Sequence, residues 1–254
     1  MCGRATLSNH DLNDVLEELD AEFSTEDASL FRPRYNIAPS DTHWIVEAKG
    51  DRRVLVPAMW GYLASASSRL LINVRGEQVA SGGGFRRAFD ARRCVMVTDG
   101  FFEWDQRRMP YWYHRPDGGL ILMAGLSQAP GAEPPGARGH AGGHASAEGH
   151  PSTKEQTGPR FPRFTVLTTR PNQLVAQVHN RMPVIIPPDR LDLWLTAEPA
   201  AASRLIAPAP DEALVATAVS RRVNSVKNDD PGCLTPAAPT DAPPPAPPRQ
   251  GSLF

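Results

Sequence analysis

Two stretches of low sequence complexity limit how much of this chain can fold. Residues 129–160 mix proline, glycine and histidine without apolar periodicity, and residues 235–254 are rich in proline. Such compositions bury too little apolar surface to offset the entropy of ordering, so we expect a disordered insertion and an extended, disordered tail. The remainder, about 200 residues within 1–234, is enough for one domain.

Hydrophobic periodicity predicts an α+β fold, a β-rich single domain of antiparallel strands with a few short helices. Apolar residues recur at helical spacing within 11–20, with Ser8 or Asn9 as the expected cap. Two turn signals, at 50–51 and 117–119, predict hairpins between the strands that flank them. The expected strands are 43–48, 54–56, 94–98, 111–114, 120–126, 164–169 and 214–219, and short helices are expected at 172–178 and 190–195.

Charge is balanced over the whole chain but uneven along it. The chain carries 27 Lys and Arg against 28 Asp and Glu, a formal net charge of −1, which by itself favours no class of partner. Residues 69–115 nevertheless hold nine arginines and five acidic residues. Arginine binds phosphate in a bidentate way and stacks on bases, so this segment is compatible with a nucleic-acid partner.

The cysteines and histidines do not indicate a metal centre. The three cysteines, at positions 2, 94 and 233, are too few for a disulfide framework and lack zinc-ligand spacing. His140, His144 and His150 lie in the low-complexity insertion without cysteine or acidic partners at ligand spacing. We therefore expect no metal and no cofactor, and a reducing, cytoplasmic location. The sequence shows no apolar run of roughly 18 residues and no signal sequence, so we expect no membrane partner.

The N-terminus carries the most reactive arrangement in the sequence. Cys2 and Gly3 follow Met1, and a small residue at position 2 favours removal of the methionine, which would leave a free α-amine beside a thiol. These groups have reference pKa values of roughly 8 and 8.5, so each is partly nucleophilic near neutrality. Toward an amide carbonyl, the amine can act as base and the thiolate as nucleophile. Toward an aldehyde, the amine forms a Schiff base and the sulfur closes it to a thiazolidine.

Six motifs follow Cys2 in order. They are 34–40 (RYNIAPS), 57–61 (PAMWG), 73–77 (NVRGE), 98–104 (TDGFFEW), 168–169 (TT) and 179–184 (HNRMPV). Together with the Met-Cys-Gly start, the series resembles the SOS-response-associated peptidases, also regarded as abasic-site processing proteins, from Cys2 to about Leu234 apart from the insertion. Glutamine amidotransferases with an N-terminal nucleophile share the start, but their glycine-rich signatures are not apparent here.

The resemblance implies that the substrate is single-stranded DNA with an abasic site, whose ring-opened sugar presents an aldehyde. Cys2 would link covalently to this sugar, and Glu103 would move protons during ring opening and Schiff-base formation. Asn73 would bind the sugar or align the N-terminus. His179, whose side chain ordinarily titrates near a pKa of about 6.5, would assist proton transfer at the linkage. Cys2, Asn73, Glu103 and His179 are thus the expected catalytic residues.

The expected DNA contacts are arginines that would bind phosphate, aromatic rings that would stack on bases, and other residues of the matched motifs. They are Arg4, Asn36, Pro39, Trp60, Arg75, Arg86, Arg87, Phe102, Trp104, Thr169 and Arg181. The three glycines at 82–84 are not followed by the Lys-Ser/Thr of a phosphate-binding loop, and we expect a flexible loop beside the DNA.

Three functions are open on the sequence. The first is an abasic-site sensor that forms a thiazolidine cross-link through Cys2 after loss of Met1 and protects the lesion during the DNA damage response, with lyase- or hydrolase-type chemistry. The second is a cysteine peptidase, acting on itself or on other chains, that uses Cys2 and His179. The third is a non-catalytic single-stranded DNA-binding protein. We expect a monomer that interacts with replication-fork proteins. In a bacterium, we expect it to associate with the nucleoid.

Overall fold

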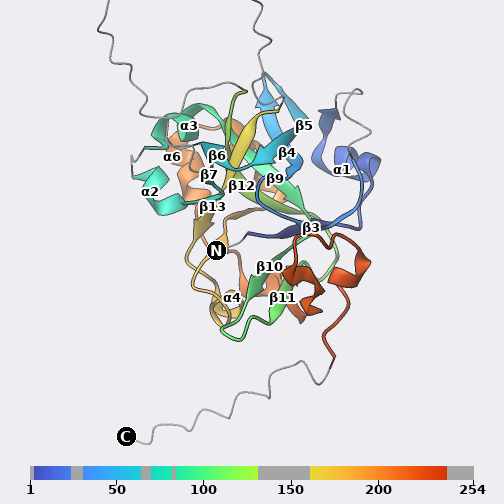
Figure 1. The fold of residues 1–254 in the computed structure, drawn as a ribbon. Coiled ribbons are helices and arrows are strands. Elements are labelled where there is room, and N and C mark those ends of the chain that lie inside the picture. Colours follow the sequence, from blue (N-terminus) through green and yellow to red (C-terminus); the bar gives the residue numbers. More distant parts are fainter. Residues whose placement is uncertain (1–2, 24–30, 64–69, 82–83, 131–160, 239–254) are drawn as a thin grey trace, which may run out of the picture.

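Two main β-sheets organise the fold (Figure 1). The computed structural model describes residues 3–23, 31–63, 70–81, 84–130 and 161–238. Cys2, the first two glycines of 82–84, most of the expected insertion and the tail beyond residue 238 lie outside the described residues. Within the described ranges, no helix is long and apolar enough to cross a membrane.

The smaller sheet takes strands from both ends of the domain. Its order in the described residues is β16–β11–β10–β1–β3, and all neighbouring strands are antiparallel. The strands are β1 (Ala5–Leu7), β3 (Arg34–Ile37), β10 (Gly100–Trp104), β11 (Pro110–His114) and β16 (Val215–Ala218). Ala5 lies opposite Phe101, and Glu103 lies opposite Tyr111. β10 is therefore the central strand, with the N-terminal strand on one side and β11 on the other.

The larger sheet is mixed. Its main path among the described residues is β14–β13–β12–β9–β4–β5–β2, with β15 beside β12 and β8 beside β13. The strands are β2 (Ala21–Phe23), β4 (Thr42–Lys49), β5 (Arg52–Trp60), β8 (Asn73–Arg75), β9 (Arg93–Thr98), β12 (Ile121–Gln128), β13 (Arg163–Thr169), β14 (Met182–Pro183) and β15 (Ile185–Ile186). A separate pair is formed by β6 (Tyr62–Leu63) and β7 (Leu70–Leu71).

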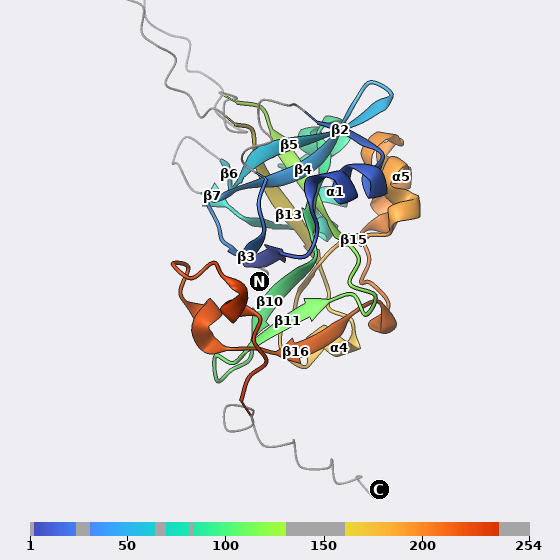
Figure 2. The same ribbon diagram turned by 90° about the vertical axis from the view of Figure 1, so that its right-hand side faces the viewer.

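Short helices accompany the larger sheet. α3 and α5 both contact β9, and the rings of Phe89 in α3 and Trp194 in α5 lie 5.9 Å apart. Figure 2 shows α5 beside the larger sheet and the red C-terminal turns beside β3 and β10. The helices are α1 (Leu12–Leu19), α2 (Gly76–Ala80), α3 (Arg86–Ala91), α4 (Gln173–Ala176), α5 (Leu191–Thr196) and α6 (Pro199–Ala202). The 3-10 turns are Pro188–Arg190, Ser203–Leu205, Asp211–Ala213, Arg221–Asn224 and Pro231–Cys233.

The structure confirms the β-rich α+β domain and corrects two features of strand pairing. The hairpin at 50–51 joins β4 to β5 as predicted. The predicted hairpin at 117–119 is wrong: β11 and β12 do not pair, because β11 belongs to the smaller sheet and β12 to the larger one. Every residue of β12 is buried, so this strand needs cover on both faces, which a local turn signal does not reveal. The pairs β2–β5, β5–β13 and β8–β13 are parallel rather than antiparallel.

The cap of the first helix also differs from the prediction. Asp11 is the N-cap of α1, and its carboxylate accepts a hydrogen bond from the Asp14 amide. The backbone amides of Ser8 and Asn9 instead donate to Asp99 Oδ2, at 2.6 and 2.9 Å. Asp99 thereby holds the turn between β1 and α1, and the helix begins after that turn.

The central strand β10 separates two apolar clusters. On one face, Phe101 belongs to the main core, which also contains side chains of the larger sheet. On the other face, Phe102 contacts a second cluster that includes Val219 and Val223 from the C-terminal turns. Side chains alternate along a strand, so Glu103 shares the face of Phe101. The fold therefore directs a carboxylate toward an apolar interior.

Candidate functional site

Glu103 is buried on the inner face of β10, where it is only 2% exposed. Burial raises its pKa to about 7, because an ionised carboxylate loses its hydration there. A carboxyl group with this pKa populates both its protonated and its ionised form at neutral pH, as a general acid or base requires. The sequence supplies the aromatic neighbours of Glu103, and the structure adds the burial.

His179 approaches Glu103 from the loop between α4 and β14. Its Nδ1 atom lies 3.7 Å from Glu103 Oε1. The backbone N–H and the backbone carbonyl of Arg181 each lie 3.0 Å from the same Nδ1, so the Arg181 backbone holds the ring whether Nδ1 accepts or donates a hydrogen bond. Burial lowers the pKa of His179, which favours the neutral form of the ring. The two predicted proton-transfer residues, from segments far apart in sequence, are thus brought together.

An ion pair holds the loop that carries His179. Arg181 Nη1 and Nη2 donate to the two carboxylate oxygens of Glu77, at 2.9 and 2.8 Å, and Nη2 also donates to Thr168 Oγ1 at 3.3 Å. The hydrogen bonds from Arg181 lower the pKa of Glu77. The sequence predicts a phosphate contact for Arg181; the structure commits its guanidinium to Glu77 and Thr168 and leaves the side chain 17% exposed, and the phosphate contact stays a prediction. Glu77 is missed by the sequence reasoning, although it lies within a matched motif.

Asn73 opens β8, which runs parallel beside β13 with Asn73 level with Val166. Trp60 supports the approach to this strand, because its indole N–H donates to Ile72 O at 3.0 Å and its ring stacks on Phe164. Trp60 is 0% exposed, which argues against the predicted stacking of its ring on a DNA base. β13 pairs at its far end with β14, so the strand beside Asn73 also supports the loop of His179.

The first described residues lead into the same region. The Phe102 amide donates to Arg4 O at 3.0 Å, and Ala5 lies opposite Phe101. Continuing this antiparallel register by two residues brings Gly3 level with Glu103. Cys2 itself lies outside the described residues, and its covalent role stays a prediction.

Three of the predicted DNA contacts are bonded to the C-terminal turns or to one another. Asn36 is 1% exposed, and its side-chain nitrogen donates to backbone carbonyls within 223–228. Arg4 Nη1 donates to Asn36 Oδ1 at 2.7 Å, and the Arg4 guanidinium lies 5.8 Å from the centre of the Trp104 ring. The indole N–H of Trp104 donates to Asn224 at 2.6 Å. These contacts give Arg4, Asn36 and Trp104 a structural role in fixing the turns against β3 and β10.

The remaining predicted DNA contacts divide by exposure. Phe102 and Thr169 are buried, at 0% and 2%, which argues against direct contact of either side chain with DNA. The exposed members are Arg75, Arg86 and Arg87, with Pro39 partly exposed. Arg86 forms an i,i+4 ion pair within α3. Arg75 and Arg87 are exposed, and neither is in an ion pair found among the described residues.

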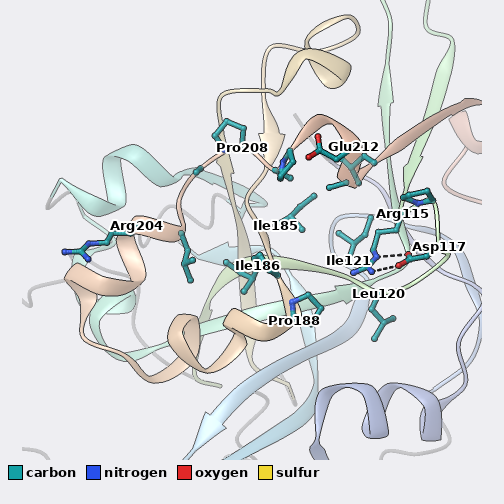
Figure 3. Close-up of a pocket in the computed structure, with 18 residues that line it drawn as sticks. Arg115, Asp117, Leu120, Ile121, Ile185, Ile186, Pro188, Arg204, Pro208 and Glu212 are labelled. Atoms are coloured by element: carbon teal, nitrogen blue, oxygen red, sulfur yellow. Dashed lines mark hydrogen bonds and ion pairs between the residues drawn. The ribbon is translucent and has the colours of Figure 1, made fainter.

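Other features of the described residues lie apart from this site. Among them there is no group of three or more His, Cys, Asp or Glu side chains that could hold a metal ion, and Cys94 and Cys233 are buried free thiols. A cavity of about 520 Å³ lies between the β11–β12 connection, β15 and the segment before β16 (Figure 3). Its walls are largely apolar, with Arg115 paired to Asp117 at 2.5 Å, and neither Glu103 nor His179 lines it.

Proteins similar to this chain occur in bacteria and in a vertebrate. Abasic site processing protein YoqW of Bacillus subtilis (strain 168) is 26% identical over 243 residues, covering 91% of this chain and 97% of the relative. Abasic site processing protein YedK of Escherichia coli (strain K12) is 26% identical and covers 77% of this chain and 81% of its own length. Abasic site processing protein HMCES of Gallus gallus is 28% identical, covering 81% of this chain and 67% of the relative.

The fold is also found in solved structures. A crystal structure of a protein from Bacteroides thetaiotaomicron has a TM-score of 0.72 at 18% identity and covers 93% of this chain and 100% of that chain. A family match extends over residues 1–226, under the description SOS response associated peptidase (SRAP). That range contains Glu103, His179 and the six ordered motifs. The chain therefore belongs to the SOS response associated peptidase (SRAP) family.

Proposed function

We propose that this protein captures abasic sites in single-stranded DNA by forming a thiazolidine through Cys2. The observation that carries the proposal is the 3.7 Å approach of His179 Nδ1 to Glu103 Oε1, beside the strand that leads in from the N-terminus. The pair provides a proton donor and a proton acceptor next to the expected aminothiol. The relatives named abasic site processing proteins, which match 91% and 77% of the chain, support the same substrate here.

The proposed reaction has three covalent steps. The α-amine of Cys2 attacks the aldehyde carbon of the ring-opened sugar and gives a carbinolamine. This intermediate loses water to form an imine, with Glu103 supplying the proton that the departing hydroxyl needs. The sulfur of Cys2 then adds to the imine carbon, and the thiol proton passes to nitrogen as the ring closes. The balance is one aldehyde and one aminothiol giving one thiazolidine and one water, without a change of oxidation state.

Glu103 and His179 have complementary proton states for these steps. Burial raises the pKa of Glu103 to about 7, so its protonated form donates to the departing hydroxyl and its ionised form accepts the proton released later. Burial lowers the pKa of His179, so the neutral ring is available to relay a proton when the linkage forms or reverses. Both roles depend on the short distance between the two groups.

The test is a cross-linking assay with purified protein and a single-stranded oligonucleotide that contains one abasic site. We expect a band that survives denaturation, with a mass equal to protein plus DNA minus one water. A matched oligonucleotide with a tetrahydrofuran analogue, which has no aldehyde, should give no band. Intact mass should show that Met1 has been removed. Wild-type protein that lacks Met1 and still gives no stable band would overturn the proposal.

Variants of Cys2 separate the proposal from its rivals. Cys2→Ala keeps an N-terminal amine but has no sulfur, so we expect only an imine, visible after borohydride reduction and lost without it. An undiminished stable band with Cys2→Ala would assign the linkage to another group. DNA binding without any covalent band would favour a binding protein. Cleavage of added polypeptides that disappears in both Cys2→Ala and His179→Ala would favour a peptidase.

A further inference from the structure

Tyr113 is a buried residue that faces the same space as Glu103. It lies on β11 opposite Phe101, and the two rings stack with their centres 5.1 Å apart. Glu103 follows Phe101 by two residues on β10, so Tyr113 and Glu103 are diagonal neighbours on one face of the sheet. Long side chains at such positions come within reach of each other. The Tyr113 side chain is 0% exposed.

Among the described residues, the Tyr113 hydroxyl has no structural bond that would explain its burial. In the part of the chain that the structure describes, its oxygen is buried and lacks a hydrogen-bond partner. Phenylalanine would fill the same space without the cost of burying a polar group. Burial raises the pKa of Tyr113 most, and the negative charge of Glu103 raises it further. The phenol therefore keeps its proton and can donate a hydrogen bond, and its titration is coupled to the charge on Glu103. A donor kept free beside a carboxylate indicates a role during the reaction rather than in the resting fold.

We infer that Tyr113 is a positioning residue for Glu103, whose carboxylate receives a hydrogen bond from the Tyr113 hydroxyl whenever Glu103 is ionised. The inference rests on the proposed function of Glu103 and deepens it. A donor that engages only the charged carboxylate stabilises that form. It thereby opposes the effect of burial and keeps both protonation states of Glu103 accessible near neutrality.

Other titratable groups face Glu103 from the elements around it. Tyr111 lies directly opposite on β11. His179 approaches from the loop before β14, and the backbone of Arg181 holds the His179 ring. Gly3 precedes the neighbouring strand β1 and has no side chain. The amine and thiol of Cys2 lie outside the described residues. Tyr113→Phe leaves all of these groups in place, so their titrations cancel when the variant is compared with the wild type at each pH.

The experiment measures cross-linking rates of the wild type and of Tyr113→Phe on abasic single-stranded DNA between pH 6 and 9. Loss of a hydrogen bond to a charged group should raise the pKa of Glu103 by about one unit. We expect the rate to be limited by the step in which ionised Glu103 accepts a proton. The variant rate divided by the wild-type rate is then about one tenth at pH 6 and about one fifth at pH 7, and approaches one at pH 9. Thermal unfolding of Tyr113→Phe should occur at the wild-type temperature or slightly above it.

Tyr111→Phe is the matched control, because it removes a hydroxyl two residues away on the same face of β11. That variant should keep the wild-type rate and pH profile. A rate ratio of one at every pH for Tyr113→Phe would overturn the inference, as would a reduced ratio that does not vary with pH and comes with lower thermal stability.

The Glu103 pKa can also be followed without DNA, by carbon NMR of its side-chain carboxyl group in the free protein. An upward shift in Tyr113→Phe supports the inference even if no cross-link forms, in which case only the proposed function fails. An unchanged Glu103 pKa in a protein that does cross-link overturns the inference and leaves the proposed function standing.

Discussion

The Nδ1 atom of His179 and the Oε1 atom of Glu103 lie 3.7 Å apart, yet burial favours the neutral form of each. Burial raises the pKa of Glu103 to about 7 and lowers the pKa of His179. Loss of hydration thus works against a permanent ion pair, even at a distance where opposite charges attract. The two side chains are therefore suited to exchanging a proton rather than to forming a stable ion pair.

The first prediction concerns stability. The pKa of Glu103 rises from a reference value of 4.5 to about 7 on folding, so the folded protein holds this proton more tightly than the unfolded chain. Stability from this group is complete below about pH 4.5 and is lost as pH rises to about 7. Glu103→Gln removes that loss and should be more stable than the wild type by up to about 3 kcal/mol at pH 8, with little difference at pH 4.5. Urea unfolding at both values measures the difference.

Glu77→Gln is the control, because it should change stability in the opposite direction to Glu103→Gln. Arg181 lowers the pKa of Glu77, so its ionised form is favoured by folding and its replacement should reduce stability above about pH 4.5. A gain in stability from Glu103→Gln that is equal at all pH values would contradict the assignment of a raised pKa.

The second prediction concerns the rate of cross-linking. His179→Ala removes the side chain that lies 3.7 Å from Glu103 and that we propose relays a proton, and the loss of one acid–base group should slow cross-link formation at pH 7 by about a hundredfold. Single-turnover gel assays measure this rate. His114→Ala is the matched control, because His114 stacks on Trp112, away from the inner face of β10, and should leave the rate unchanged. An unaltered rate in His179→Ala would remove His179 from the mechanism.

The third prediction separates a positioning arginine from a phosphate contact. Arg181→Ala should slow cross-linking but keep the affinity for undamaged single-stranded DNA, because Arg181 is bound to Glu77. Arg75→Ala should weaken that affinity and reduce the slope of log affinity against log salt by about 0.7, the value for one phosphate contact on a single strand. Fluorescence anisotropy at several salt concentrations measures both. The exposed Arg190→Ala serves as the control, and an Arg181→Ala variant with a reduced salt slope would restore its predicted phosphate contact.

The fourth prediction concerns the insertion. Gln128 and Arg163 lie opposite each other on β12 and β13, so residues 131–160 connect two adjacent strand ends. Replacing them with four glycine or asparagine residues shortens the connection about fourfold and should stabilise the domain by about 1 kcal/mol. Cross-linking should stay within twofold of the wild type. A full-length variant with residues 131–160 scrambled is the control, and a large loss of rate in both variants would assign the insertion a sequence-specific role.

The sequence predicts several regular elements of the domain but not the strands β1, β8 and β10 that position the site. The strand that becomes β9 is visible as a continuous apolar run, and the helix α1 is visible because apolar residues recur at helical spacing. The loop of His179 and the strand of Glu103 are located by ordered motifs, but nothing in a linear pattern places the two side chains 3.7 Å apart. The distance between these two side chains depends on how the two sheets pack around a common core. That packing is set by contacts between residues far apart in the sequence.

The predicted DNA contacts illustrate why exposure escapes sequence reasoning. An arginine or an aromatic ring in a motif is equally compatible with a ligand contact and with a buried support. Asn36, with its amide bonded to the C-terminal turns, and Trp60, bonded to Ile72 O, belong to the second kind. Only the packed structure distinguishes these from Arg75, which remains exposed.

The strand order of the smaller sheet has a consequence for protein synthesis. β10 carries Glu103 between β1 from the start of the domain and β11, which pairs in turn with β16 near its end. A chain still on the ribosome that has emerged only through β12 holds Glu103 and the N-terminal residues but not the loop of His179. Because domains generally fold as units, the acid–base pair first exists when the last strand has left the ribosome. Translation itself therefore delays the meeting of Glu103 and His179 until the surrounding domain is complete.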